Sequence, residues 1–252
     1  MPVITKIKII PLLFSSLLLF PVLSGAALPG ADGIVAKADE VRSPQLDYTV
    51  DVRVTSINPD GAERTSEYEV LVKGKEKTII KTLSPAADRG RTLLMLGKDL
   101  WAFLPDVSKP IRISLQQRLI GEVANGDIAR ANFAGDYKAT LLRVDKAGGR
   151  DYYVLELNAL SEEVTYNKVV YWVDKANYYP LKAEFYTISG RLLKTCSYED
   201  YRLLAGVKRP SRLVLKDPLA AGRKSVIEYV GMKAADLPAK YFTKDYMKKL
   251  KY

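Results

Sequence analysis

The sequence contains no histidine and a single cysteine, Cys196, among its 252 residues. The missing histidine excludes a Ser-His-Asp triad, a Cys-His pair and the common zinc sites, which need histidine or several cysteines. One cysteine cannot form a disulfide within the chain. Because Cys196 lies in a segment that reads as a β-strand, we predict that it is a small buried hydrophobic residue rather than a reactive thiol.

Two common catalytic motifs are also missing. No Gly-x-Ser-x-Gly elbow surrounds Ser84, and no Gly-Lys-Ser/Thr follows Gly121 and Gly126, which excludes a nucleophile elbow and a phosphate-binding loop at these places. The carboxylates of the central stretch read as solvated groups of turns and helix ends: Asp88, Asp99, Asp106, Glu122 and Asp127. We predict that the protein is not an enzyme and binds no cofactor or metal. A hydrolase of envelope polymers is the alternative, and it would need two carboxylates close together in a cleft.

The charge is basic but dispersed. Lysine and arginine number 39 against 29 aspartates and glutamates, which gives a net charge of +10. No basic stripe is interleaved with aromatic residues in the manner of a nucleic-acid-binding module, so we expect no nucleic-acid partner. Attraction to anionic phospholipid headgroups, and hence transient contact with a membrane, fits this charge. Solubility alone would explain it equally well.

One long apolar run, Ile9–Leu23, stands near the N-terminus. Lys6 and Lys8 precede it, and the small residues 24–26 follow it, which is the pattern of a secretory signal peptide. The run is short for a membrane span, although an uncleaved anchor is the alternative. No second run is long enough to span a membrane.

This leader defines the predicted organisation. Residues 1–26 form a cleaved signal peptide, with cleavage after Ala27 as the second choice, and residues 27–252 form a single domain. The expected location is the periplasm.

The remainder of the chain is dominated by strand patterns. Residues 46–57 alternate between apolar and polar, and Asn58-Pro59-Asp60-Gly61 is a strong hairpin turn. Similar segments recur to residue 232, which gives about 11–12 antiparallel strands. Short helices are expected over 31–41, with Asp32 as its N-cap, within 116–134, and over 241–250. A sheet of this size must curl, split or close, so we predict a mainly β, strongly curved single sheet that forms an unclosed β-barrel covered by helices.

A set of short motifs recurs in a characteristic order between Ser84 and Tyr201. The first group is Ser84-Pro85, Asp88, Gly90, Leu100-Trp101, Leu104-Pro105, Ile111-Arg112-Ile113, Gly121 and Asp127. The second group is Asp174, Tyr179-Pro180-Leu181-Lys182, Phe185-Tyr186, Gly190, Lys194 and Asp200-Tyr201. Together they cover most of the chain that follows the leader.

This order of motifs resembles the outer-membrane lipoprotein-sorting protein family, whose members are LolA-like periplasmic proteins. The resemblance implies an unclosed β-barrel whose concave face, covered by helices, holds acyl chains in a hydrophobic cavity. It also implies lipoprotein transport, with cargo received from an inner-membrane transporter and passed to an outer-membrane acceptor. The expected function is therefore a monomeric periplasmic carrier of lipid or of lipoprotein acyl chains. A non-carrier interaction or regulatory module of an envelope lipid-export system is the alternative.

A lipid carrier needs an apolar cavity, because buried methylene groups supply its affinity at about 0.8 kcal/mol each. The candidate lining residues are apolar side chains of the strands and of the helical cover, each of which would serve equally well as dry core: Leu94, Leu96, Trp101, Phe103, Ile111, Ile113, Leu119, Ile120, Val123, Phe133, Trp172 and Phe185. Arg112 lies between two apolar strand positions and faces the opposite way. It is either solvent-facing or a contact for a lipid headgroup.

Overall fold

A computed structural model describes residues 30–249 of the protein, so the predicted signal peptide lies outside the described residues. Within this range the helices are α1 (Ala31–Arg42), α2 (Asn125–Ala129) and α3 (Lys244–Met247), with 3₁₀ turns at Ala86–Asp88 and Ala239–Tyr241. The strands are β1 (Tyr48–Ile57), β2 (Glu63–Lys73), β3 (Lys77–Ser84), β4 (Thr92–Leu96), β5 (Asp99–Phe103), β6 (Ile111–Ile113), β7 (Arg118–Ile120), β8 (Val123–Ala124), β9 (Tyr137–Ala147), β10 (Arg150–Ala159), β11 (Lys168–Asp174), β12 (Pro180–Tyr186), β13 (Leu192–Leu204), β14 (Val207–Lys216) and β15 (Lys224–Ala234). None of the helices in residues 30–249 is long and apolar enough to cross a membrane.

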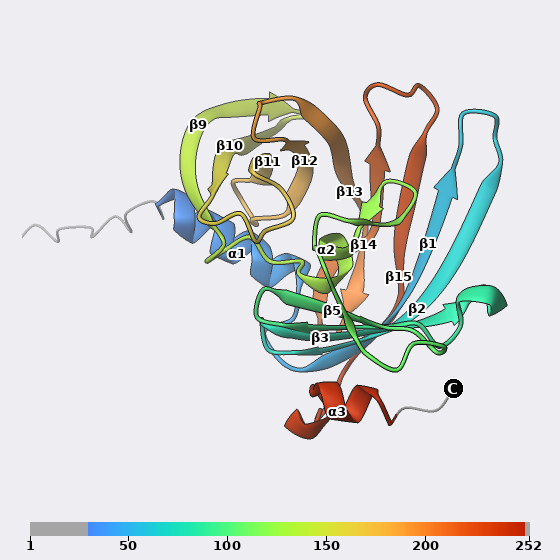
Figure 1. Cartoon of the computed structure of the whole chain (residues 1–252). Coiled ribbons are helices and arrows are strands. Elements are labelled where there is room, and N and C mark those ends of the chain that lie inside the picture. The colour runs from blue at the N-terminus through green and yellow to red at the C-terminus, as the bar shows by residue number, and fades with distance from the viewer. Residues whose placement is uncertain (1–29, 250–252) are drawn as a thin grey trace, which may run out of the picture.

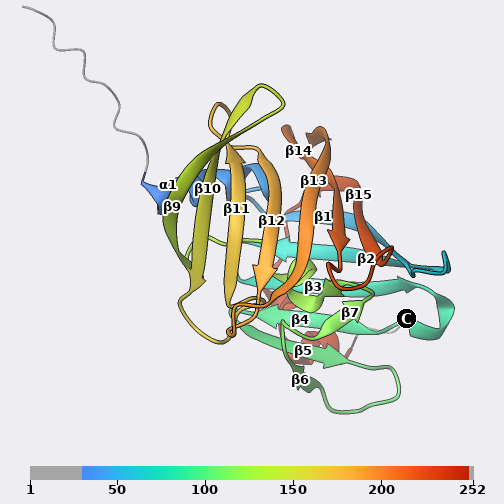
Figure 2. The same cartoon turned by 90° about the horizontal axis from the view of Figure 1, so that it is seen from above.

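Thirteen of the described strands form one antiparallel sheet in the order β6-β5-β4-β3-β2-β1-β15-β14-β13-β12-β11-β10-β9. The sheet curves from β9 through β13 and back to β6, and its two edge strands do not pair with each other (Figure 2). This confirms the predicted unclosed, curved sheet, with slightly more strands than expected. The first strand pairs with the last in the middle of the sheet, where Tyr48 lies opposite Ala234.

The two-residue period of the strands decides which side chains face the concave side. On β1 these are Val50, Val52 and Val54, which are almost fully buried, while Arg53 between them is exposed. Residues with the same orientation on almost all of the remaining strands of the sheet join them in one large apolar cluster. The main core of the protein therefore lies inside the curve of the sheet.

The segment 114–136 connects the two edge strands and lies inside the curve, as the position of β7 in Figure 2 shows. We refer to it as the insert. The sequence predicted short helices here, which is only partly right, because the insert folds as the β7–β8 hairpin followed by the single short helix α2. Gly121 turns this hairpin with a φ of +52°, a conformation that glycine adopts easily.

Helix α3 covers the convex face instead. Its Met247, with Leu237 and Phe242 before it, packs against Leu71 of β2 and Ile79 of β3. Figure 1 shows α3 on the side of β3 and β5 that is opposite to α2. Both faces of this half of the sheet are therefore buried, which removes the simple alternation of apolar and polar residues from its strands.

Helix α1 begins at its N-cap Gly30, so the prediction that Asp32 is the N-cap is wrong. The Asp32 carboxylate instead accepts a hydrogen bond of 2.8 Å from the backbone N–H of Ala139 and contacts the ammonium of Lys138. It therefore ties the first turn of α1 to the edge strand β9. The sequence does not distinguish an N-cap aspartate from an aspartate in the first turn, because an acidic residue stabilises the start of a helix at either position.

Candidate functional site

A pocket of about 480 Å³ opens on the concave face between β2–β6 and the insert. Its floor follows one row of the strand register, in which Ile80 pairs with Leu93, Leu93 with Ala102, and Ala102 with Ile111. The insert forms the opposite wall with Leu119 and Ile120. The volume falls within the range of about 300–1,000 Å³ that is usual for small-molecule sites.

The polar groups of this pocket include four charged side chains, Arg64, Asp88, Arg91 and Arg118. The two carboxylate oxygens of Asp88 are each 3.0 Å from a guanidinium nitrogen, one of Arg64 and one of Arg91. The Arg118 guanidinium lies 3.9 Å from Glu122, beyond hydrogen-bonding distance. Ser66, Thr82, Gln117 and Asn125 add uncharged polar groups to the lining. A strip of apolar side chains flanked by polar and charged groups matches the anatomy of a site for an amphiphilic ligand.

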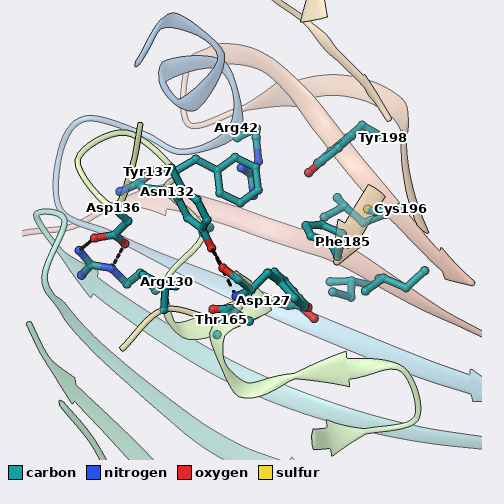
Figure 3. Close-up of a pocket in the computed structure, with 18 residues that line it drawn as sticks. Arg42, Asp127, Arg130, Asn132, Asp136, Tyr137, Thr165, Phe185, Cys196 and Tyr198 are labelled. Atoms are coloured by element: carbon teal, nitrogen blue, oxygen red, sulfur yellow. Dashed lines mark hydrogen bonds and ion pairs between the residues drawn. The ribbon is translucent and has the colours of Figure 1, made fainter. Parts of the chain in front are cut away.

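The other half of the curved sheet is filled. The close-up in Figure 3 shows the small cavity there, with Phe185, Cys196 and Tyr198 on one side and the ion pair of Arg130 with Asp136 on the other. Its free volume of about 30 Å³ leaves room for only one or two water molecules. It is too small for an acyl chain, so the pocket between β2–β6 and the insert, which lies on the concave face, is the candidate site.

A buried cation and carboxylate lie beside this small cavity. The Arg42 guanidinium stacks over the rings of Phe133 and Tyr198, with its carbon 4.4 Å and 5.4 Å from the ring centroids. Asp39 lies 3.5 Å from Arg42 and accepts hydrogen bonds from the backbone N–H groups of Phe133 and Ala134. Burial raises the pKa of Asp39, although the nearby Arg42 charge opposes the shift. This pair secures the end of the insert to helix α1.

A second buried network fixes the middle of the insert. The Lys194 ammonium of β13 lies 2.7 Å from the Asp127 carboxylate and donates a hydrogen bond of 2.5 Å to the carbonyl oxygen of Glu122. The hydroxyl of Tyr166 also donates to Asp127, at 2.6 Å, and the hydroxyl of Ser225 accepts from the backbone N–H of Glu122. Lys194 and Asp127 come from distant parts of the sequence, and together they hold one wall of the candidate site in place.

Cys196 lies in β13 and is buried, as predicted. Burial raises the pKa of its thiol to about 12. We therefore expect no reaction with a disulfide reagent such as dithiobis(nitrobenzoate) at pH 8 in the native protein, and one equivalent of reaction in 6 M guanidinium chloride, because only the thiolate is a nucleophile. Absorbance of the released thiolate measures this directly. Rapid stoichiometric labelling of the native protein would contradict the buried position.

Seven of the predicted lining residues lie on the concave side. Ile111, Ile113, Leu119 and Ile120 line the candidate pocket. The others are buried in the core beside it: Val123, Phe133 and Phe185. For Val123, Phe133 and Phe185 the structure therefore favours the dry-core alternative that the sequence left open.

The other predictions of lining residues are wrong, because these side chains lie on the convex face. Leu94, Leu96 and Phe103 pack in the cluster beneath α3, and the ammonium of Lys244 lies 3.1 Å from the ring centroid of Trp101. Trp172 lies in a separate cluster on the outer face of β10–β12. The reason is the register, in which Leu94 pairs with Trp101 while the neighbouring Leu93 pairs with Ala102.

Arg112 also faces away from the pocket. It pairs in register with Trp101, its guanidinium contacts Asp99, and it lies 3.6 Å from Glu163. Of the two roles considered for Arg112, the structure therefore favours the solvent-facing one, because Asp99 and Glu163 already balance its positive charge.

Sequence reasoning missed much of the actual lining. The missed residues are apolar side chains of the concave side and arginines from three separate segments of the chain: Tyr68, Ile80, Leu93, Ala102, Leu104, Arg64, Arg91 and Arg118. One available signal was Arg112, which was already expected to face away from its apolar neighbours. Once β5 and β6 are paired, Trp101 lies opposite Arg112 and must share its outward face.

Known proteins share this architecture. A family model with the description "-like: Uncharacterized protein" matches residues 74–249. A LolA superfamily protein from Nitrosomonas europaea is 52% identical, with a TM-score of 0.83 over 86% of this chain and 99% of that one. None of the curated proteins compared matches this chain.

More distant structures show the same fold. A candidate outer membrane lipoprotein-sorting protein domain from Vibrio parahaemolyticus is 23% identical, with a TM-score of 0.74 over 87% of this chain and 98% of that one. A DUF1329 family protein from Desulfovibrio piger is 22% identical, with a TM-score of 0.75 over 86% and 97% of the two chains.

Proposed function

This chain belongs to the LolA superfamily, and we propose that it is a periplasmic carrier that binds lipid, or the acyl chains of lipoproteins, without chemical conversion. The observation that carries the proposal is the pocket of about 480 Å³ on the concave face. The description of the Vibrio parahaemolyticus domain as an outer membrane lipoprotein-sorting protein also supports the carrier proposal.

The apolar lining supplies the affinity. Burial of about ten methylene groups contributes about 8 kcal/mol, which corresponds to a dissociation constant near 1 µM before the cost of ordering the chain. Such binding needs no precise geometry, because the hydrophobic effect is not directional. The apolar strip along the pocket floor therefore suits an alkyl chain.

A carrier role also agrees with the state of the carboxylates that a hydrolase would need. Asp88, Asp99 and Asp127 each contact a cation. A catalytic pair of carboxylates must instead face a common substrate bond.

The proposed carrier works as a monomer formed by residues 27–252. An inner-membrane transporter would supply the cargo and an outer-membrane acceptor would receive it, with transient contact at each membrane. The cargo would reach the pocket from the side where the exposed side chains of Arg64, Arg91 and Arg118 border it.

Ala102→Trp tests the proposal, because Ala102 lies in the centre of the pocket floor and an indole there would occupy the space of the ligand. We expect the wild-type protein, isolated from the periplasm, to carry about one lipid per chain in native mass spectrometry, and the variant to carry at least tenfold less. The matched control is Ala147→Trp, at an exposed position near the end of β9, which should retain the lipid.

Lipid extraction from the wild-type protein then identifies the class of cargo. A wild-type protein that carries no lipid, and also ignores added phospholipid and acylated peptide, would overturn the carrier proposal and favour the interaction module. Equal lipid content in the two tryptophan variants would instead show that the bound lipid lies elsewhere.

A further inference from the structure

We propose that the cargo is an amphiphile with an anionic phosphate headgroup, held by Arg64, Arg91 and Arg118 beside the apolar floor of the pocket. This inference rests on the proposed function, since it names the chemical class of the ligand of the same site. It comes from a surplus of positive charge in the pocket wall that the protein itself does not neutralise.

The surplus follows from the four charged residues that line the pocket, which are three arginines and one aspartate. Asp88 balances one positive charge, and Glu122, which lies 3.9 Å from Arg118 outside the pocket lining, opposes a second, so about one positive charge is left unbalanced. The side chains of Arg64, Arg91 and Arg118 are 66%, 53% and 66% exposed, so their guanidinium groups reach the solvent at the pocket opening rather than the core. An anion at this opening would be attracted by all three.

The position of Asp88 makes this a prearranged site rather than a chance group of cations. One oxygen of its half-buried carboxylate lies 3.0 Å from Arg64 and the other 3.0 Å from Arg91, so a single carboxylate holds two guanidinium groups beside each other. Each guanidinium carries five N–H donors in a planar fork, and Asp88 accepts from only one of them on each arginine. The remaining donors suit the several acceptor oxygens of a phosphate.

Arg118 approaches from the opposite wall. Arg64 belongs to β2 and Arg91 directly precedes β4, whereas Arg118 begins β7 of the insert. A phosphate between them would link the sheet to the insert while its alkyl chain lies along Leu93, Ala102 and Ile111. A neutral headgroup would leave the surplus charge unmatched. The arrangement thus favours anionic over neutral amphiphiles that have the same chain.

The test is displacement of the neutral fluorescent probe N-phenyl-1-naphthylamine from the mature protein at low ionic strength, below the aggregation concentration of each competitor. Hexadecyl phosphate and hexadecanol share one chain and differ in the headgroup. We expect the phosphate to displace the probe at a concentration at least tenfold lower than the alcohol. Inorganic phosphate alone should displace none, and salt should reduce the preference.

The variant Arg91→Gln/Arg118→Gln should lose the preference for the phosphate by about tenfold while its affinity for hexadecanol stays the same. Arg53→Gln is the control, since Arg53 lies on the convex face and also bonds one carboxylate, that of Glu67, at 3.0 Å. Equal displacement by the two wild-type competitors, or an unchanged preference in the double variant, overturns the inference.

Two further outcomes separate this inference from the proposed function. If neither competitor nor the probe binds, the carrier proposal itself fails. If inorganic phosphate prevents binding of hexadecyl phosphate at a similar concentration, the arginines serve a free phosphate, and the assignment of an amphiphile is wrong.

Discussion

Asp127→Ala is expected to lower the free energy of unfolding by about 3–5 kcal/mol, the range for loss of one partner from a buried ion pair. Asp127 accepts from Lys194 at 2.7 Å, from the Tyr166 hydroxyl at 2.6 Å and from the backbone N–H of Ala124 at 2.8 Å. The Lys194 ammonium is almost fully buried, so the alanine variant leaves it without a counter-charge inside the protein. The midpoint of urea unfolding, at an unchanged m-value, measures the loss.

The matched control is Glu67→Ala, which removes the surface partner of Arg53 and should cost only about 0–1 kcal/mol. The double variant Asp127→Ala/Lys194→Met should lose less than the two single variants together, because the methionine leaves no buried charge. Similar losses in Asp127→Ala and Glu67→Ala would show that the buried pair does not hold the insert.

Gly121→Ala should lower the free energy of unfolding by about 2–5 kcal/mol, from the backbone strain and the overpacking combined. A methyl group at Gly121 would lie 2.2 Å from the hydroxyl oxygen of Ser56 and 2.4 Å from that of Ser225. Both serines are buried and have little room to move. The φ of +52° adds its own cost for alanine. The midpoint of thermal or urea unfolding reports the change.

Gly74→Ala is the control that separates the backbone strain from the overpacking. Gly74 has a φ of +59°, but its new methyl group would meet no atom within 4 Å. It should therefore show only the strain, at about 1–2 kcal/mol. If Gly121→Ala costs no more than this control, the close contact of the β7–β8 turn with β1 and β15 is absent in solution.

The elements of the sheet could be predicted from the sequence because strands and hairpin turns leave local signals. The alternation in 46–57 and the turn 58–61 correspond to β1 and its connection to β2. The same reasoning was only partly right in the insert, where long-range contacts decide the structure. Lys194 and Ser225 hold the β7–β8 hairpin from strands that are distant in sequence, and no local pattern reports such partners.

The candidate site was less predictable for a related reason. The run from Leu93 to Leu96 is apolar throughout, since the insert side covers one face of β4 and α3 covers the other. Composition then cannot tell which residues face the concave side, and only the pairing of Leu93 with Ala102 resolves it. The arginines of the pocket lie on three separate segments of the chain, so their convergence appears only after folding.

The pairing of β1 with β15 also bears on how the chain assembles. Every other pair of neighbours in the thirteen-stranded sheet is consecutive in the sequence, so the two series β1–β6 and β9–β15 each grow by adding adjacent hairpins. The loop-closure entropy of a distant contact arises mainly at this one seam. Residues 224–234 complete the seam, and until they are in place the two halves share no strand pairing. The strand pairing that joins the two halves of the concave face therefore depends on a segment near the C-terminal end of the described residues, although the insert that fills the curve lies in the middle of the chain.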